Sequence, residues 1–168
     1  MRRLSNFTCF RHHNSLNVEA CNINEWLEIA VNKKRASAEK WDSPGFFPHV
    51  ILERRYEQFP DNLTGYIQFD IDSDKYLKFY DTRESVMSAI FELPECHLVA
   101  HSFSKHGIWG LVKASEDALI MDFKEGALKA LNPLTKELHL DLDLSVSSRL
   151  LAFRLIPEGM MYRTKFRR

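Results

Sequence analysis

The chain is poor in cysteine, carries no net charge and contains no long apolar run, and each of these deficits excludes a class of protein. Three cysteines in 168 residues are too few and too widely spaced for a disulfide framework, and they favour a reducing compartment. The 23 basic and 23 acidic residues cancel, so nucleic-acid binding must come from local patches. No stretch approaches the roughly 18 apolar residues of a membrane helix, and we find no signal-peptide core. We therefore expect a soluble, intracellular protein with no membrane partner.

The composition suits one folded domain, because apolar residues make up 45% of the chain. We predict a single domain over residues 1–168, with an N-terminal α/β part at 1–60, a core at 61–157 and a basic tail at 158–168. Hydrophobic periodicity and capping residues predict helices at 22–35, 81–93 and 115–131, and strands at 50–56, 65–71, 97–101, 107–114, 138–143 and 150–156. This order predicts an α+β fold: a mixed, mostly antiparallel sheet with helices on one face and polar residues on an open face.

Acidic residues alternate with apolar ones at two places. In an extended strand, residues two apart point the same way, so Asp70 and Asp72 share one face while Phe69 and Ile71 take the other. The same parity pairs Asp141 with Asp143, and it pairs Ser104 with His106. A sheet that collects these strands could hold three carboxylates, an imidazole and the Arg154 guanidinium over one patch of surface.

That set of groups is typical of two-metal nucleotidyl transfer. Two divalent cations roughly 4 Å apart can clamp the attacking and leaving oxygens of a phosphoryl group. Magnesium needs few protein ligands, so two or three aspartates suffice. His106 and Arg154 would then bind the triphosphate of a nucleotide.

Three segments carry a family resemblance. They are Asp70-Ile71-Asp72, Phe103-Ser104-Lys105-His106, and Asp143-Leu144 with Val146 and Phe153-Arg154-Leu155. In order and offset they resemble the three motifs of the archaeo-eukaryotic primase superfamily, in particular its primase-polymerase branch, and the third segment is also similar to the primase subunit of herpesvirus helicase-primases. The resemblance covers roughly residues 64–157 and lies in motifs. It departs from the family at Ser147, Leu150 and Leu151, where tyrosine and polar or basic residues are common.

The resemblance implies an RRM-like primase palm and a DNA-templated nucleotidyltransferase, a primase or DNA polymerase. Asp70, Asp72 and Asp143 would hold two Mg²⁺ or Mn²⁺ ions, with ribo- or deoxyribonucleoside triphosphates as substrates. Ser104, Lys105, His106 and Arg154 would form the nucleotide-binding set. The implied partners are a single-stranded DNA template, a primer, and a helicase or zinc-binding primase module in cis or in trans. By analogy, a compact domain of this kind suits a virus or mobile element.

The residues alone leave several points undecided. Parity puts Asp141 and Asp143 on one face, and the family offset to Arg154 favours Asp143. The basic residues offered for template contact are Arg54, Arg55, Arg163, Lys165 and Arg167, any of which could instead be an ordinary solvated charge. Two alternative functions remain: a replication-accessory module that binds nucleic acid without turnover, and a metal-dependent nuclease.

Overall fold

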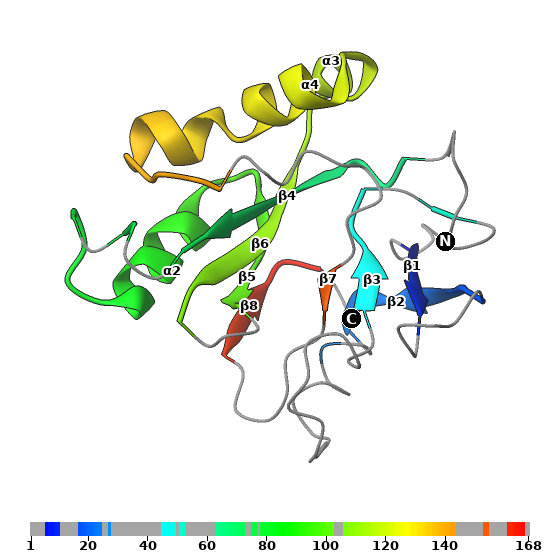
Figure 1. The fold of residues 1–168 in the computed structure, drawn as a ribbon, viewed down its shortest axis with the longest axis horizontal. Coiled ribbons are helices and arrows are strands. Elements are labelled where there is room, and N and C mark those ends of the chain that lie inside the picture. Colours follow the sequence, from blue (N-terminus) through cyan, green and yellow to red (C-terminus); the bar gives the residue numbers. More distant parts are fainter. Residues whose placement is uncertain are drawn as a thin grey trace. The chain divides into compact units, whose positions relative to one another are not determined.

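The computed structural model divides the chain into two compact units, and each is described by itself (Figure 1). Unit 1 comprises residues 1–64, 149–160 and 166–168, and unit 2 comprises residues 65–148 and 161–165. The residues that the structure describes are 6–10, 17–24, 27, 45–49, 51–52, 63–72, 75–76, 78–102, 106–143, 153–154 and 161–166. The predicted α+β class with antiparallel pairing is confirmed, although the strands form two sheets rather than one. The assignment of residues 1–168 to a single domain stays a prediction.

Unit 1 contains a four-stranded antiparallel sheet. Its strands are β1 (Asn6–Phe10), β2 (Glu19–Asn22), β3 (Gly45–Phe47) and β7 (Phe153–Arg154), in the order β2-β1-β3-β7. Phe10, Phe47 and Leu52 form a buried apolar cluster in this unit. Arg154 is paired with Gly45 and Phe153 with Phe46, so the described residues of the strand predicted over 150–156 pair with β3.

Two other predictions concern unit 1. Of the strand predicted over 50–56, the described residues Ile51 and Leu52 are not in a strand. The Leu52 amide donates to the side-chain hydroxyl oxygen of Thr8 at 2.9 Å instead of to a neighbouring strand. Of the helix predicted from residue 22, Ile23, Asn24 and Leu27 are helical. The remaining residues of both segments lie outside the described part of the chain.

The sheet of unit 2 has the strand order β4-β6-β5-β8. Its strands are β4 (Tyr66–Ile71), β5 (Cys96–His101), β6 (Ile108–Lys113) and β8 (Tyr162–Thr164), and the first three match predicted strands. Because β4 and β5 both pair antiparallel with β6, they run parallel to each other and need a crossover connection. Helix α2 (Arg83–Glu92) lies in that connection.

Local sequence explains where α2 begins. The Ser85 amide donates to the Thr82 hydroxyl at 3.1 Å, and the Thr82 amide donates back to the Ser85 hydroxyl at 3.4 Å, which makes a reciprocal capping box. The capping pair is therefore Thr82 and Ser85, and α2 begins two residues after the start predicted at residue 81. The predicted apolar side is confirmed, since Val86, Met87, Ile90 and Leu93 are buried.

The segment predicted as one helix over 115–131 forms two. They are α3 (Glu116–Ile120) and α4 (Phe123–Ala130). The break falls at Met121, whose backbone is extended, and the Asp122 carboxylate starts the second helix by accepting from the Lys124 amide at 3.0 Å. Buried residues of α2, α3 and α4 belong to one core cluster with the sheet, so the predicted placement of helices on one face holds for unit 2 (Figure 1).

The open face that the sequence predicts for this sheet stays a prediction, and the alternation along β4 shows which residues lie on that side. Tyr66, Gln68 and Asp70 alternate with core-facing residues of β4 and point away from the helices. Tyr66 and Gln68 are buried, and Asp70 is partly buried. In the register with β6, Tyr66 lies opposite the exposed Lys113, Gln68 opposite the buried Leu111 and Asp70 opposite the buried Trp109. Asp70, at the end of β4, is therefore the acidic residue of this strand on that side.

Segment 138–143, predicted as a strand, is irregular. It follows a π-helical turn, η2 (Pro133–Glu137), and the Leu140 amide donates to the Leu134 carbonyl at 3.1 Å. Leu140 and Leu142 are nevertheless buried, as the alternation predicts. Asp141 is exposed and Asp143 is half-buried.

Part of the predicted basic tail is an ordered strand. β8 pairs with β5, with Tyr162 opposite Ala100 and Thr164 opposite Leu98. Residues 161–165 therefore belong to the fold of unit 2 and are not a solvated end. Among the described residues, no helix combines the length and the apolar character needed to span a membrane.

Candidate functional site

The end of β4 positions the first two aspartates. Asp70 lies in β4 opposite Trp109 of β6 and is half-buried, while Asp72 follows the strand directly and is exposed. Phe69 and Ile71 point into the core, so the parity predicted for this segment is confirmed. The Asp72 carboxylate lies 3.7 Å from the Lys75 ammonium, a contact that the sequence analysis did not predict.

The third aspartate lies beside the first. The Asp143 amide donates to the Asp70 carbonyl at 3.0 Å, which holds the two main chains side by side at the end of β4. Asp143 is the member of the Asp141 and Asp143 pair that makes this contact. Two residues 73 positions apart in the sequence are thereby adjacent in unit 2.

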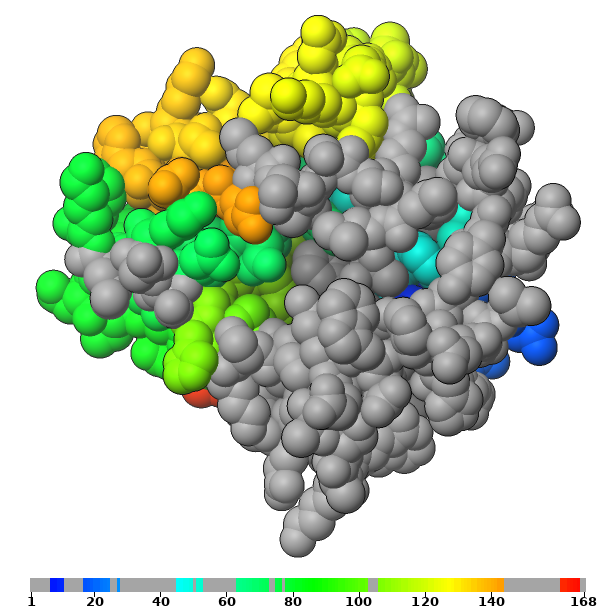
Figure 2. Space-filling view, viewed as in Figure 1, coloured from blue at the N-terminus to red at the C-terminus, as the bar shows by residue number. Residues whose placement is uncertain are grey.

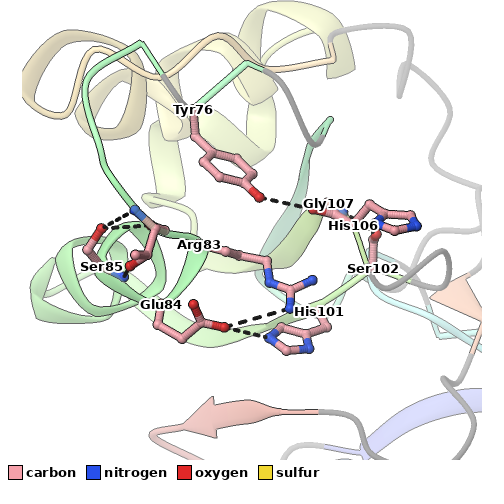
Figure 3. Close-up of polar contacts among 9 residues, drawn as sticks. Tyr76, Arg83, Glu84, Ser85, His101, Ser102, His106 and Gly107 are labelled. Carbon is pink, nitrogen blue, oxygen red and sulfur yellow. Dashed lines mark hydrogen bonds and ion pairs between the residues drawn. The ribbon is translucent and has the colours of Figure 1, made fainter.

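A tight loop brings His106 to the same end of the sheet. The Ser102 amide donates to the Gly107 carbonyl, the Gly107 amide donates back to the Ser102 hydroxyl, and both distances are 2.9 Å. The Tyr76 hydroxyl points to this loop and donates to the His106 carbonyl at 3.2 Å (Figure 3). His106 itself is exposed. Ser104 and Lys105, the other predicted residues of this loop, lie outside the described residues.

Gly107 determines how closely the loop approaches β4. A Cβ atom at this position would lie 2.5 Å from the Ile71 carbonyl oxygen and 3.1 Å from the Ser102 hydroxyl. Only glycine allows this approach without a backbone shift. His106 and Asp72 flank the contact in sequence, so Gly107 sets the spacing between the second motif and the first.

The remaining predicted residues are not brought to this end by the described contacts. Arg154 lies in β7 of unit 1. Arg163 is exposed in β8. The Lys165 ammonium donates to the Leu93 carbonyl at 2.7 Å, at the C-terminal end of α2, and lies 5.0 Å from the Phe91 ring centroid. Arg54, Arg55 and Arg167 lie outside the described residues. The predicted contacts of all five basic residues with a template stay predictions.

A charged cluster that was not predicted from the sequence joins the start of α2 to the end of β5. The Glu84 carboxylate lies 3.7 Å from the Arg83 guanidinium and 3.8 Å from the His101 imidazole, and it contacts both groups (Figure 3). Burial lowers the pKa of His101, the nearby Arg83 charge lowers it further, and the Glu84 charge opposes both. No local pattern in the sequence pairs the start of a helix with the end of a later strand.

Gln68 is a second residue that sequence reasoning missed. Its side chain points to the same side of β4 as Asp70, two residues away, and is 2% exposed. Within the described part of the chain, neither its amide nitrogen nor its amide oxygen has a hydrogen-bond partner. Burying an unsatisfied amide costs on the order of 1–3 kcal/mol, so the sheet keeps a polar group here at the expense of stability.

The carboxylates at this end of the sheet are chemically suited to a hard divalent cation, but they do not form a complete coordination site. Asp70, Asp72 and Asp143 offer carboxylate oxygens, the ligands that Mg²⁺ and Mn²⁺ prefer. Across the described part of the chain, no group of three or more histidine, cysteine, aspartate or glutamate side chains is arranged to hold a metal ion. The described residues therefore offer carboxylates of a suitable chemical kind and no assembled metal site. No family model, curated protein or solved structure matches the chain.

Proposed function

We propose that the chain is a DNA-templated nucleotidyltransferase of the primase-polymerase type, with its catalytic residues in unit 2. The observation that carries the proposal is the hydrogen bond from the Asp143 amide to the Asp70 carbonyl, because it joins the first and third acidic segments. The loop that holds His106 packs against the Ile71 carbonyl, next to Asp72. Three segments selected for their chemistry thus meet at one end of one sheet.

The topology of unit 2 also supports the proposal. β4, α2 and β5 form a crossover unit with β6 inserted between the two parallel strands, which is a split β-α-β arrangement. Segment 140–143 reaches the other edge of β4 through Asp143. An RRM-like palm built on β4, β5 and β6 is therefore our proposal for the finer fold of unit 2.

In this proposal the carboxylates of Asp70, Asp72 and Asp143 hold two Mg²⁺ or Mn²⁺ ions. When bound, such ions would stabilise the charge on the transferring phosphoryl group and lower the pKa of the attacking hydroxyl. The His106 imidazole contacts the triphosphate from the loop, and Tyr76 fixes the main chain of that loop through its hydroxyl. A primer 3′-oxygen bonds to the α-phosphorus, pyrophosphate leaves, and the hydroxyl proton passes to solvent.

The proposed substrates and partners follow from this chemistry: ribo- or deoxyribonucleoside triphosphates, a primer and a single-stranded DNA template. Arg154, Ser104 and Lys105 remain proposed nucleotide contacts. A helicase or a zinc-binding primase module in cis or in trans is a proposed further partner.

One observation favours a second candidate function. The described residues include no closed three-ligand metal group. A domain that binds a primer-template and does not turn over would need no such group. We therefore retain a replication-accessory nucleic-acid-binding module as the alternative.

Extension of a labelled primer on a single-stranded template, in Mg²⁺ and in Mn²⁺ with each nucleotide set, tests the proposal. The Asp70→Asn, Asp143→Asn and His106→Gln variants should lose product while the matched surface variant Asp117→Asn keeps it. Comparing Asp141→Asn with Asp143→Asn tests the assignment of the third carboxylate. Binding of the primer-template by the native chain with no product would support the accessory module. A shortened primer would indicate a nuclease.

A further inference from the structure

An exposed aromatic side chain in unit 2 lies close to a histidine ring and to a lysine ammonium. The Phe79 side chain is 56% exposed. Its ring centroid lies 5.7 Å from that of His139, with 38° between the ring planes, and the Lys78 ammonium lies 5.4 Å from the Phe79 centroid. His139 and Lys78 are themselves exposed. We refer to Phe79, His139 and Lys78 as the aromatic platform.

The platform joins the two segments that carry the candidate metal ligands. Phe79 lies seven residues after Asp72, and His139 lies four residues before Asp143. The segments are tied together next to the platform, where the Tyr80 hydroxyl donates to the Leu138 carbonyl at 3.4 Å. Figure 2 shows the orange residues that precede Asp143 against green residues of the same unit. Phe79 and His139 therefore join the same two segments that carry Asp72 and Asp143.

Two features separate Phe79 from an incidental surface residue. Six large apolar side chains are exposed among the described residues, namely Ile51, Phe79, Ile120, Met121, Leu128 and Met161, and Phe79 is the aromatic one. Its stacking partner His139 has a backbone φ of 55°, the only positive φ of a described residue other than glycine. A left-handed conformation is uncommon for residues other than glycine, although histidine adopts it more often than most, and such residues cluster at functional positions. Here it presents the imidazole to the Phe79 ring.

We propose that the aromatic platform binds single-stranded nucleic acid by stacking a base on the Phe79 ring. Exposed aromatic rings next to cationic groups bind single strands in this way, because every base has a π-face and the cation contacts a phosphate. The choice of the DNA template or primer strand as the ligand rests on the proposed function. Acidic residues Asp81, Glu137 and Asp141 lie on the same segments, so stacking rather than net charge must supply most of the affinity.

Fluorescence anisotropy with a labelled single-stranded oligo-dT tests the proposal on the full chain. Phe79→Ala should weaken binding by about 5- to 150-fold, the range measured for loss of one base-aromatic stack. Phe79→Trp should retain binding, and its added indole fluorescence should be quenched when the oligonucleotide binds. Lys78→Gln should reduce the slope of log affinity against log salt by about 0.7, the value for one phosphate contact to a single strand.

Ile120→Ala is the matched control, because Ile120 is an exposed apolar residue of the same unit, on α3. Equal weakening by Phe79→Ala and Ile120→Ala, or no weakening by Phe79→Ala, would overturn the platform. Absence of oligonucleotide binding by the native chain would overturn it as well. Binding that depends on Phe79 in a chain that extends no primer would support the platform and contradict the proposed catalysis, so the two failures are distinguishable.

Discussion

The two ends of the sheet in unit 2 use their polar groups differently. At the far end, where β4 begins and β6 ends, main-chain hydrogen bonds join the segments that lead into and out of the strands. The Lys113 amide donates to the Glu95 carbonyl at 2.8 Å, and the Ala114 amide donates to the Gly65 carbonyl at 2.9 Å. At the site end, where β4 ends and β6 begins, main-chain bonds hold together segments whose side chains are ionisable, such as Asp70 and Asp143. We infer that the far end serves stability and the site end serves chemistry.

The largest effect that would separate the two ends is expected from a glycine substitution. Gly107→Ala at the site end should cost roughly 2 kcal/mol in the free energy of unfolding and abolish nucleotide binding. The reason is that the new Cβ would lie 2.5 Å from the Ile71 carbonyl oxygen and would push the His106 loop away from β4. Urea denaturation and nucleotide titration of the same samples provide the two measurements.

Gly65→Ala at the far end is the matched control. Gly65 has a φ of 85° and open space around its Cβ position, so alanine should cost about 1 kcal/mol through backbone strain alone. Nucleotide binding should be unchanged. Equal loss of binding in the two variants would mean that the ends of the sheet are not independent.

A smaller loss of stability is expected when Lys165, at the far end, is replaced by alanine. Its ammonium donates to the Leu93 carbonyl, one of the terminal acceptors of α2, and lies over the Phe91 ring. Lys165→Ala should lower the free energy of unfolding by about 1 kcal/mol, measured by thermal or urea melting. Arg163→Ala, two residues away in β8, should leave stability unchanged. If Lys165→Ala weakened oligonucleotide binding and left stability intact, Lys165 would contact a template instead.

A substitution of Gln68 is expected to raise the free energy of unfolding instead of lowering it. Its buried amide has no hydrogen-bond partner among the described residues, so Gln68→Met, which keeps the shape and removes the amide, should raise the free energy of unfolding by about 1 kcal/mol. Melting curves of the native chain and the variant measure this gain. A loss of stability would show that the amide has a bonding role within the fold. A gain accompanied by weaker nucleotide binding would assign Gln68 to the site end.

The sequence predicted the elements whose signals are local. The alternation around Asp70 and the apolar spacing of residues 86–93 are contained in single segments, and the structure agrees with both. The strand that alternation predicted over 138–143 is wrong. Leucines at every second position can be buried without a strand when the main chain finds hydrogen-bond partners in the preceding turn, as the Leu140 amide does at the Leu134 carbonyl. Likewise, the periodicity of 115–131 did not reveal that Asp122 restarts the helix.

The parts of the site that could not be predicted are contacts between distant segments. The chemistry of Asp70 and Asp143 was visible in the sequence, but their main-chain hydrogen bond depends on how segment 140–143 packs against β4. The pairing of Phe79 with His139 joins residues 60 positions apart, and nothing in either local sequence selects the partner. Long-range pairing of this kind comes from the packing of the whole unit, and a single sequence gives no register for it.

The smallest effect we expect concerns the pH dependence of the site end. Burial and the Arg83 charge lower the pKa of His101 below its ordinary value, so the folded state favours the neutral imidazole. The unfolded chain binds a proton at higher pH than the folded protein does. The contribution of His101 to stability is therefore complete above a pH of about 6.5 and is lost as the pH falls through the lowered pKa of the folded state.

Two charge-neutralising variants of adjacent residues should move that pKa in opposite directions. Arg83→Gln removes a positive charge and should raise the pKa of His101, whereas Glu84→Gln removes the opposing negative charge and should lower it further. An NMR titration of the His101 imidazole measures both shifts, and His97, at the far end of the same strand, is the internal reference that neither variant should affect. Shifts of the same sign would mean that the two variants act by rearranging the loop. Shifts of opposite sign would show that Arg83 and Glu84 act on the pKa of His101 through their charges. The pKa of a group at the site end could then be changed without changing the structure of the far end.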